Sequence, residues 1–572
     1  MRRLSRTILA LGTAALTALA ATTVAGPAGA ADPAYDVLVF SKTAGFRHDS
    51  IPAGITAIRE LGAANNFTVT ATEDSGVFTT ANLARYRAIV FLSTTGDVLN
   101  DAQQAAVETY IRGGGGYVGV HSAADTEYNW PFYGQLVGAW FASHPAIQQA
   151  KVRVEDRAHA ATAHLPQTWT RTDEWYNYQT NARSTAHVLA SLDESSYSGG
   201  GMGADHPHAW CKTLDGGRSF YTGGGHTIES YSDPAFRAHL LGGIRYAAGR
   251  TRADCRPEVG YTALYNGSTT GWTQAGPGGF SNTDATLSSS GGLGMYWYNT
   301  KQFTSYSLKL DWKLTGDDNS GVVVGFPATT DPQAALDKGY EVQIDATDTP
   351  DKTTGSVYGV QAADIAARDA ALNPPGEWNT YELLVEGQRL QVFLNGVRIN
   401  DFTNTNSARS LAGYVGIQNH GDADHVSFRN IRIKDLGGTT PPGNPRTGRV
   451  TGLAGKCLDI NGAGTADGTK IQLWSCNGQA NQVWSIDGQV WRNPNSNKCL
   501  GTAGGGTGNG TKVQLSTCNG SGGQNWAAQS NGSVRNPQSN RCLDVSGNNS
   551  ADGTQVQIWD CNGQANQRWT LP

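Results

Sequence analysis

Residues 447–572 contain three copies of one sequence unit, and this triplication limits the possible folds more than any other feature of the chain. In each copy two cysteines stand 19 positions apart, and the first cysteines of successive copies are 42 and 43 residues apart. Periods near 40 also suit β-propeller blades, but a propeller needs about four to eight blades, whereas a β-trefoil closes with three units. The spacing therefore predicts a C-terminal β-trefoil.

Each unit also ends in a Gln-x-Trp element, at residues 482–484, 524–526 and 567–569. We expect the three tryptophans to meet in the core around the threefold axis rather than to bind a ligand. The repeated cysteine pairs and Gln-x-Trp elements closely resemble the ricin-B-type lectin family, which also occurs as carbohydrate-binding modules on secreted bacterial glycosidases. The resemblance implies that this domain binds sugar.

Sugar recognition requires an aromatic face for the pyranose ring and carboxylate and amide groups for its hydroxyls. The first and third units supply such a set, but the second has Gly501, Ser516 and Gly523 at the places of the aspartate, tryptophan and asparagine. We therefore expect two working sugar sites. They consist of Asp459, Gln472, Trp474, Asn481 and Gln482, and of Asp544, Gln557, Trp559, Asn566 and Gln567.

All eight cysteines of the chain can pair, which fits an oxidising compartment. No Cys-x-x-Cys motif occurs, so zinc-ribbon and thioredoxin chemistry are poorly supported. The expected disulfides are Cys457–Cys476, Cys499–Cys518 and Cys542–Cys561 within the repeats, which leaves Cys211 and Cys255 for each other.

Residues 1–30 have the order of a secretory signal peptide, with arginines first, then an apolar stretch at 8–24, then Ala-Gly-Ala at 28–30. We expect cleavage and a secreted, extracellular protein without a membrane span; a membrane anchor is the alternative. The net charge of −5 and the lack of a Lys/Arg run with interleaved aromatics argue against nucleic acid. The expected partner is a polysaccharide, oligosaccharide or glycoconjugate.

Residues 34–249 read as alternating strands and helices, beginning with a continuous apolar run at 37–40. A helix from about residue 51, a strand at 88–92, a helix near 102–111 and a strand at 117–120 follow. This βαβ succession predicts an α/β domain with a parallel sheet. Ligands of such sheets bind beyond the carboxyl ends of the strands, here at residues 42–48 and 121–125.

Four segments, at residues 119–122, 172–176, 217–221 and 225–227, resemble the trehalose-utilisation (ThuA-like) family, which is similar in fold to class I glutamine amidotransferases. Where an amidotransferase has its nucleophilic cysteine, this chain has His121, so glutaminase activity is not expected.

Several histidines and a glutamate stand near those expected strand ends. Imidazole and carboxylate suit proton transfer and metal binding equally, so either task is open. The alternative is that these are buried, hydrogen-bonded groups of a domain that keeps only its scaffold. His206 and His208 are interpreted as structural. The candidate set is His48, His121, Glu174 and His226.

Residues 258–436 contain short alternating strands separated by Gly, Asn and Asp, which is typical of an antiparallel sandwich. Asn395-Gly396 predicts a tight hairpin. Segments that include residues 319–321, 339–345 and 416–421 resemble the 3-keto-disaccharide hydrolase family. The resemblance implies a concanavalin-like jelly roll that acts on oxidised glycosides or related sugars.

Period-two geometry places Glu341, Gln343 and Asp345 on one face of one strand. Such a polar row can line a cleft or form a solvated outer face, and we favour the cleft. Glu341 is the candidate base, Asp345 a metal ligand or its orienting partner, and His420 the acid. Trp378 is a candidate for sugar stacking at a rim. A divalent metal is an open option, and no other cofactor is indicated.

A Pro/Gly/Thr-rich segment at 437–446 predicts a linker between the second and third domains. The combination favours a secreted glycoside or 3-keto-glycoside hydrolase with an appended lectin module. A non-catalytic, glycan-binding adhesin or scavenger is the alternative. In a third hypothesis, only the first domain is catalytic.

Overall fold

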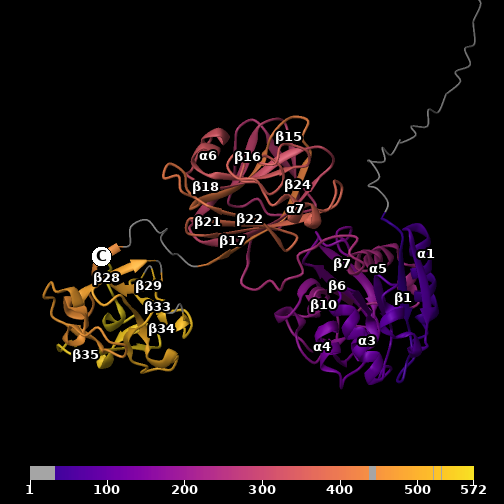
Figure 1. Ribbon diagram of the computed structural model, residues 1–572, viewed down its shortest axis with the longest axis horizontal. Coiled ribbons are helices and arrows are strands. Elements are labelled where there is room, and N and C mark those ends of the chain that lie inside the picture. The colour runs from indigo at the N-terminus through magenta and orange to yellow at the C-terminus, as the bar shows by residue number, and fades with distance from the viewer. Residues whose placement is uncertain (1–31, 437–445, 488, 519–520, 530) are drawn as a thin grey trace, which may run out of the picture.

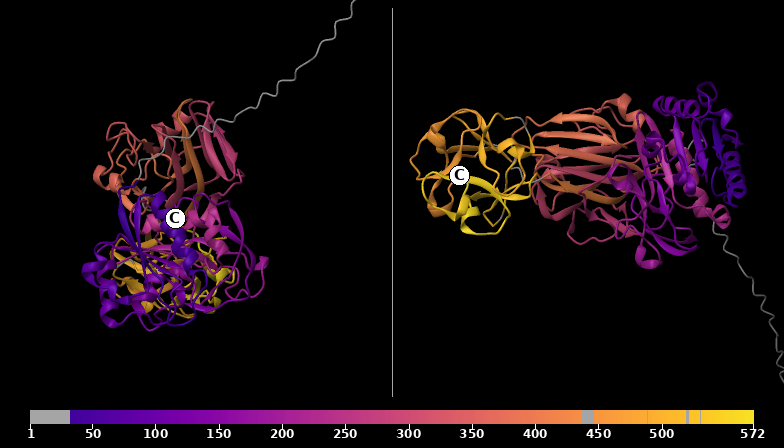
Figure 2. Two further views of the ribbon diagram at one scale, coloured as in Figure 1. Left: turned by 90° about the vertical axis from the view of Figure 1, so that its right-hand side faces the viewer. Right: turned by 90° about the horizontal axis from the view of Figure 1, so that it is seen from below.

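The computed structural model describes residues 32–436, 446–487, 489–518, 521–529 and 531–572. Along the chain these form an α/β domain, a β-sandwich and a β-trefoil (Figure 1). The sandwich lies between the other two in the second view of Figure 2. The expected signal segment lies outside the described residues, as does the expected linker apart from residue 446. No helix in the described ranges is long and apolar enough to cross a membrane.

The N-terminal domain is built on one nine-stranded sheet. Its first five strands are parallel neighbours and its last four are added in antiparallel fashion. A separate two-stranded sheet pairs β5 (Phe141–Ser143) with β8 (Asn177–Tyr178). In spatial order the strands are β2 (Phe67–Thr72), β1 (Tyr35–Phe40), β3 (Ala88–Leu92), β4 (Gly116–Val120), β11 (Gly217–Thr222), β10 (Pro207–Leu214), β9 (His187–Leu192), β6 (Gln148–Val154) and β7 (Thr168–Asp173).

Helices cover both faces of this sheet because the central strands are apolar on both sides. In β1, Val37 and Val39 belong to one buried cluster and Leu38 and Phe40 to another. Helices α1 (Ile51–Ala64) and α5 (Pro234–Ala247) pack on the first cluster. The other cluster contains residues of α2 (Thr80–Leu83), α3 (Asp101–Arg112) and α4 (Pro131–Val137). The predicted βαβ core is confirmed.

The antiparallel half of the sheet departs from the expected parallel order. Strands β10 and β11 are joined by Asp215 and Gly216, whose φ angles are 50° and 98°. Two consecutive positive φ values define the tight turn that suits a two-residue hairpin, so the strands it joins must be antiparallel.

The middle domain consists of two antiparallel sheets packed on one apolar core. Helices α6 (Pro332–Lys338) and α7 (Ile365–Ala371) complete it. The larger sheet runs β14 (Gly279–Thr283), β15 (Thr286–Ser290), β24 (Val426–Asp435), β17 (Tyr306–Leu314), β20 (Asn379–Glu386), β21 (Arg389–Leu394) and β22 (Val397–Thr403), with β12 (Thr262–Tyr265) beside β24. The smaller runs β13 (Trp272–Ala275), β16 (Gly294–Phe303), β23 (Gly413–Asn419), β18 (Asn319–Phe326) and β19 (Tyr340–Asp345).

The predicted sandwich and its marked turn are both confirmed. Asn395 and Gly396, with φ angles of 47° and 86°, join β21 to β22, and Leu394 pairs with Val397 across the turn.

The C-terminal domain is the predicted β-trefoil. Its repeat tryptophans Trp484, Trp526 and Trp569 are buried in one cluster, and each indole N–H donates a hydrogen bond of 2.9 Å to a leucine carbonyl of its own repeat. This confirms their core role. The strands are β25 (Arg446–Arg449), β26 (Cys457–Ile460), β27 (Ile471–Trp474), β28 (Val483–Asp487), β29 (Val490–Asn493), β30 (Lys498–Thr502), β31 (Val513–Ser516), β32 (Ala527–Ala528), β33 (Val534–Asn536), β34 (Arg541–Val545) and β35 (Thr554–Trp559).

All four expected disulfides are present, and the chain has no free cysteine. Cys211 on β10 is bonded to Cys255, which lies in the segment between α5 and β12. This bond anchors the connection between the first two domains to the sheet of the first.

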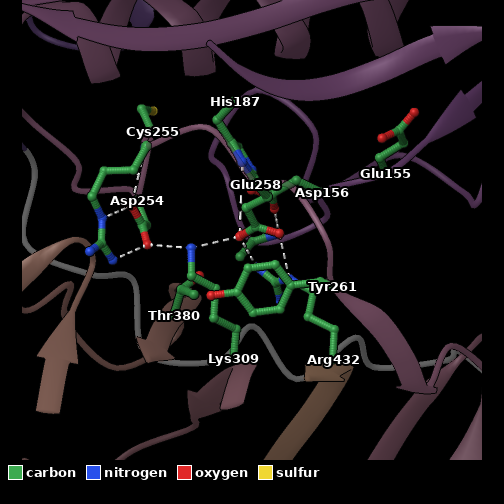
Figure 3. A network of polar contacts seen from close by, with 12 residues as sticks. Glu155, Asp156, His187, Asp254, Cys255, Glu258, Tyr261, Lys309, Thr380 and Arg432 are labelled. Atoms are coloured by element: carbon green, nitrogen blue, oxygen red, sulfur yellow. Dashed lines mark hydrogen bonds and ion pairs between the residues drawn. The ribbon is translucent and has the colours of Figure 1, made fainter. Parts of the chain in front are cut away.

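A buried charge network crosses the same junction (Figure 3). Glu258, in the connecting segment, accepts hydrogen bonds from Arg432 of β24 at 2.6 and 2.7 Å and from Lys309 of β17 at 2.8 Å. On the side of the first domain, Asp156 binds His187 at 2.7 Å, and His187 lies 3.9 Å from Glu258. The first two domains are therefore joined by paired charges as well as by a covalent bond.

Candidate functional sites

The polar row on β19 faces away from the sandwich core, as predicted. Val342 and Ile344 belong to the core cluster, whereas Glu341, Gln343 and Asp345 alternate with them. Their exposed fractions are 6%, 1% and 6%. The row is therefore buried, and the alternative of a solvated outer face is wrong.

A cavity of about 320 Å³ opens beside this row. Glu341 and Gln343 of β19 line it together with Gln418 of β23 and His420, which follows that strand. One carboxyl oxygen of Glu341 and the amide oxygens of Gln343 and Gln418 are buried without a hydrogen-bond partner. A buried polar atom is costly unless it is paired, and these three acceptors beside the cavity are unsatisfied within the described part of the protein.

The close approach of Glu341 to the neighbouring strand depends on a glycine. On β18, Gly321 lies opposite Gln343 and diagonal to Glu341. A Cβ atom at position 321 would stand 2.1 Å from a carboxyl oxygen of Glu341 and 2.6 Å from its Cγ. Only glycine therefore leaves room for the carboxyl group where it lies.

Burial is the one physical cause that shifts the ionisation of Glu341. It raises the pKa of this carboxyl group from 4.5 to about 8, with no compensating charge or hydrogen bond. A carboxyl group that titrates near neutral pH can both take and give a proton during a reaction.

Asp345 does not line the cavity. Its carboxylate accepts hydrogen bonds from the backbone N–H groups of Thr347 and Asp348 and from the side-chain amide of Asn319, each at 2.9 Å. Asn319 in turn accepts a bond of 3.2 Å from the amide of Gln343. The geometry thus favours the orienting role for Asp345 over that of a metal ligand.

The two weaker candidates of this domain occupy different places. His420 lies at the mouth of the cavity, half exposed, with its Nδ1 3.0 Å from Asp424. Trp378 was expected at a rim, but it is buried, and the guanidinium of Arg429 lies 3.6 Å from its ring centre. Asn319 and Gln418 lie in segments that carry the family resemblance, but the sequence analysis did not select either as a site residue, because nothing in the sequence shows that their strands share a sheet with β19.

The N-terminal domain brings its four predicted residues together. His48 precedes α1, His121 follows β4, Glu174 follows β7 and His226 lies in the loop after β11. One ligand atom from each lies within 4.8 Å of those of the others. His121 also has a φ angle of 51°, a conformation that non-glycine residues adopt rarely and that clusters at functional sites. The expected grouping at the strand ends is present.

The charges of this group are strongly coupled. Burial, followed by the nearby His121 and His226, lowers the pKa of His48 to about 3. Burial alone would raise the pKa of Glu174, but hydrogen bonds from His121 and His226 outweigh it and leave that pKa below its usual value. Sequence reasoning missed His144, whose Nδ1 lies 3.0 Å from Glu174, because it belongs to none of the motif segments.

The candidate sugar-site residues of the first and third lectin repeats have the same geometry. Asp459 accepts hydrogen bonds from Gln472, Asn481 and Gln482 at 2.7 to 2.9 Å. Trp474 is 38% exposed beside this set. The third repeat matches it: Trp559 is 42% exposed, and Asp544 accepts bonds of 2.6 to 3.0 Å from Gln557, Asn566 and Gln567. In the second repeat, Gly501 stands at the place of the aspartate.

These features define a protein of three domains, in which an α/β domain and a β-sandwich precede a β-trefoil. Three family models match the domains in the same order, as the sequence resemblances predicted. The chain thus carries a trehalose utilisation (ThuA) domain, matched at residues 36–247, a 3-keto-alpha-glucoside-1,2-lyase-like domain at 260–434, and a ricin-type beta-trefoil lectin domain at 446–569. It is a carbohydrate-active protein.

Similarity to individual proteins is local. A stretch of 54 residues is 43% identical to the ribosome-inactivating protein PMRIPt of Polygonatum multiflorum, and one of 70 residues is 37% identical to beta-galactoside-specific lectin 2 of Viscum album. These matches span 9% and 12% of this chain and the same shares of those relatives. A solved ThuA-like protein of Bacteroides uniformis is 24% identical, with 39% of this chain and 94% of that chain covered and a TM-score of 0.34.

Proposed function

We propose that the protein is a secreted enzyme whose middle domain cleaves 3-keto-glycosides and whose lectin domain holds it on a glycan. The observation that carries the proposal is the buried, unpaired Glu341 carboxyl group, with a pKa of about 8, in a cavity lined by amides. The match of this domain to the lyase-like family supports the substrate class.

A keto group at C3 makes the neighbouring C2 proton acidic, so one base can start the reaction. Glu341 in its carboxylate form takes the C2 proton, a C1–C2 double bond forms, and the C1–O bond to the leaving sugar breaks. His420 gives a proton to the departing oxygen. Water then adds across the double bond and yields the 3-keto sugar, so the two steps together amount to hydrolysis.

The other lining groups have positioning roles in this scheme. The unpaired amide oxygens of Gln343 and Gln418 can accept hydrogen bonds from sugar hydroxyls. Asp345 holds Asn319, which accepts a bond from Gln343 and fixes that amide.

The lectin domain adds retention on the substrate. Two sugar sites on a tethered module raise the local concentration of substrate without new catalytic contacts. Four disulfides fit the oxidising environment of a secreted protein.

The test is turnover of a panel of glycosides and 3-keto-glycosides by the full chain. We expect cleavage of 3-keto-glycosides, and Glu341→Gln should lower kcat by about 10²- to 10⁴-fold, the usual cost of removing a proton-transfer group. Because Glu341 must lose its proton to act as a base, kcat/KM of the wild type should rise with pH and level off above about 8.

Glu386→Gln, which changes an exposed glutamate at the end of β20, is the matched control and should keep the wild-type rate. Equal rates for Glu341→Gln and wild type would refute the assignment of the base. No turnover of any keto-glycoside, together with intact glycan binding, would favour the adhesin.

A further inference from the structure

The four candidate side chains of the ThuA domain have the spacing of a metal-binding site. Nε2 of His121 lies 3.1 Å from Nδ1 of His226 and 3.4 Å from Oε2 of Glu174, and that oxygen is 3.1 Å from Nδ1 of His226. A tetrahedral ion with bonds of about 2.0 to 2.1 Å sets its ligand atoms roughly 3.3 Å apart. The three distances therefore already match the edges of such a tetrahedron.

The fourth side chain completes the set. The ring of His48 lies edge-on to those of His121 and His226, with centres 4.8 and 4.9 Å apart. The ligand atoms of all four residues lie within 4.8 Å of one another. Bare lone pairs at such distances repel, so either the hydrogen of an N–H group or a metal ion lies between them.

Outer contacts orient the ligand atoms. Nδ1 of His121 donates to the carbonyl oxygen of Gly223 at 2.9 Å, which leaves the lone pair of Nε2 directed at the centre of the group. Nδ1 of His48 lies 3.3 Å from the hydroxyl of Ser122, and the second carboxyl oxygen of Glu174 lies 3.0 Å from Nδ1 of His144.

The loop that carries His226 is fixed by a buried carboxylate. Asp173 accepts hydrogen bonds from the backbone N–H groups of Gly225 at 2.8 Å and His226 at 3.1 Å, and it is paired with Arg171 at 2.8 Å. Asp173 is a positioning residue, because its contacts set the place of His226.

We propose that the ThuA domain binds one divalent transition-metal ion of the zinc type through His48, His121, Glu174 and His226. Three imidazoles and one carboxylate favour such an ion over magnesium or calcium, which prefer oxygen ligands. Within the described part of the chain, the only other group of metal-type ligands is His159 with Cys211 and Cys255, whose sulfurs are joined in a disulfide. One ion per chain is therefore expected.

The experiment is titration of the full chain, without a histidine tag and after removal of metals with a chelator, with Zn²⁺ in a calorimeter. Co²⁺ is the spectroscopic probe, because its visible absorption reports coordination by nitrogen and oxygen. We expect one equivalent of each ion to bind and Mg²⁺ not to compete. Glu174→Gln and His226→Ala should each weaken binding by more than about 100-fold, and His144→Ala by about 10-fold as an outer contact.

His164→Ala is the matched control, since it removes an exposed histidine of the same domain, outside the four-residue group, whose Nε2 lies 2.9 Å from the carbonyl oxygen of Ala235. Near-ultraviolet circular dichroism of the metal-free proteins checks folding. If Glu174→Gln does not fold, His226→Ala carries the test, because its side chain is 20% exposed. Wild-type protein that binds no ion, or binds it equally well in the ligand variants, would overturn the proposal and leave a shared proton at the centre.

Discussion

At the scale of single residues, Glu341 shows how burial without partners creates reactivity. A carboxylate in this position would lose its hydration and gain no hydrogen bond at its buried oxygen, so the protonated form is favoured up to a pH of about 8. Ionisation of this buried group lowers the free energy of unfolding of the domain. If Glu341 is the proposed base, its burial is a case in which stability is traded for function.

The raised pKa of Glu341 determines how the stability of the fold depends on pH. Between pH 4.5 and about 8 the folded protein holds a proton on Glu341 that the unfolded chain has released, so rising pH destabilises the fold in this window. Each pKa unit corresponds to about 1.4 kcal/mol. Glu341→Gln mimics the protonated form and should melt at a higher temperature than wild type, with a difference that grows from pH 5 to pH 8.

Calorimetric melting of both proteins across this range checks the prediction, with Glu386→Gln as the exposed control. A constant difference between Glu341→Gln and wild type at every pH would contradict it.

At the scale of elements, the β-trefoil shows the same scaffold with and without the candidate sugar-binding residues. All three repeats bury the tryptophan of the Gln-x-Trp element in the same way, yet only two combine a buried aspartate with an exposed tryptophan. The packing of the core therefore does not depend on the candidate sugar-binding residues. This explains how the second repeat can lack them without loss of the fold.

We expect Asp459→Ala and Asp544→Ala each to weaken binding to a glycan surface and the double variant to abolish it. Each single variant keeps one site but loses the gain from two linked sites, which can reach about 10²- to 10⁴-fold. A glycan array followed by surface plasmon resonance measures both effects.

Asp467→Ala, which removes an exposed carboxylate of the same domain, should bind like wild type. Because the aspartates are buried, Asp459→Asn and Asp544→Asn are the variants to use if the alanine proteins misfold. Unchanged binding by the folded double variant would disprove the two sites.

The elements also show what the sequence could predict. Continuous apolar runs and the βαβ order were enough to predict strands β1, β3 and β4. Because parallel strands end at the same edge of a sheet, the sequence also predicted that His121 lies close to the other candidate histidines and Glu174. The antiparallel half was missed: a two-residue turn makes β10 antiparallel to β11, and the pairings among β10, β9, β6 and β7 follow from longer connections that carry no motif. The alternation of side chains along a strand predicted which face of β19 carries Asp345. It did not predict that Asp345 lies away from the cavity, because its carboxylate accepts a hydrogen bond from the backbone N–H of Thr347 in the following turn.

At the scale of the whole molecule, the first two domains are joined by more than the chain that runs between them. A disulfide bonds the segment between these two domains to the sheet of the first, and a buried network of charges around Glu258 reaches the second. Burial alone would raise the pKa of Glu258, but Arg432, His187 and Lys309 outweigh it and hold that pKa below its usual value. The network therefore stabilises the junction above the ordinary pKa of a glutamate and weakens as the pH falls through the lowered value.

Glu258→Gln would leave Arg432 and Lys309 buried with less negative charge, and loss of one partner of a buried pair typically costs about 3 to 5 kcal/mol. We expect a lower melting temperature for the first two domains and an unchanged transition for the lectin domain. Differential scanning calorimetry at neutral pH measures these transitions, and Glu386→Gln serves again as the control. A wild-type melting profile for Glu258→Gln would show that the network does not stabilise the junction.

The contact between Gly321 and Glu341 has a consequence for the evolution of this domain. Since a Cβ at position 321 would overlap the carboxyl group where it lies, a chain that holds the glutamate in this place needs the glycine, whereas a chain that turns the side chain away or has lost the glutamate is released from that requirement. Among relatives of the middle domain, the two positions should therefore change together. Glycine paired with glutamate would then mark the lineages that retain chemistry, and substitution of both would mark those in which the sandwich survives only as a scaffold.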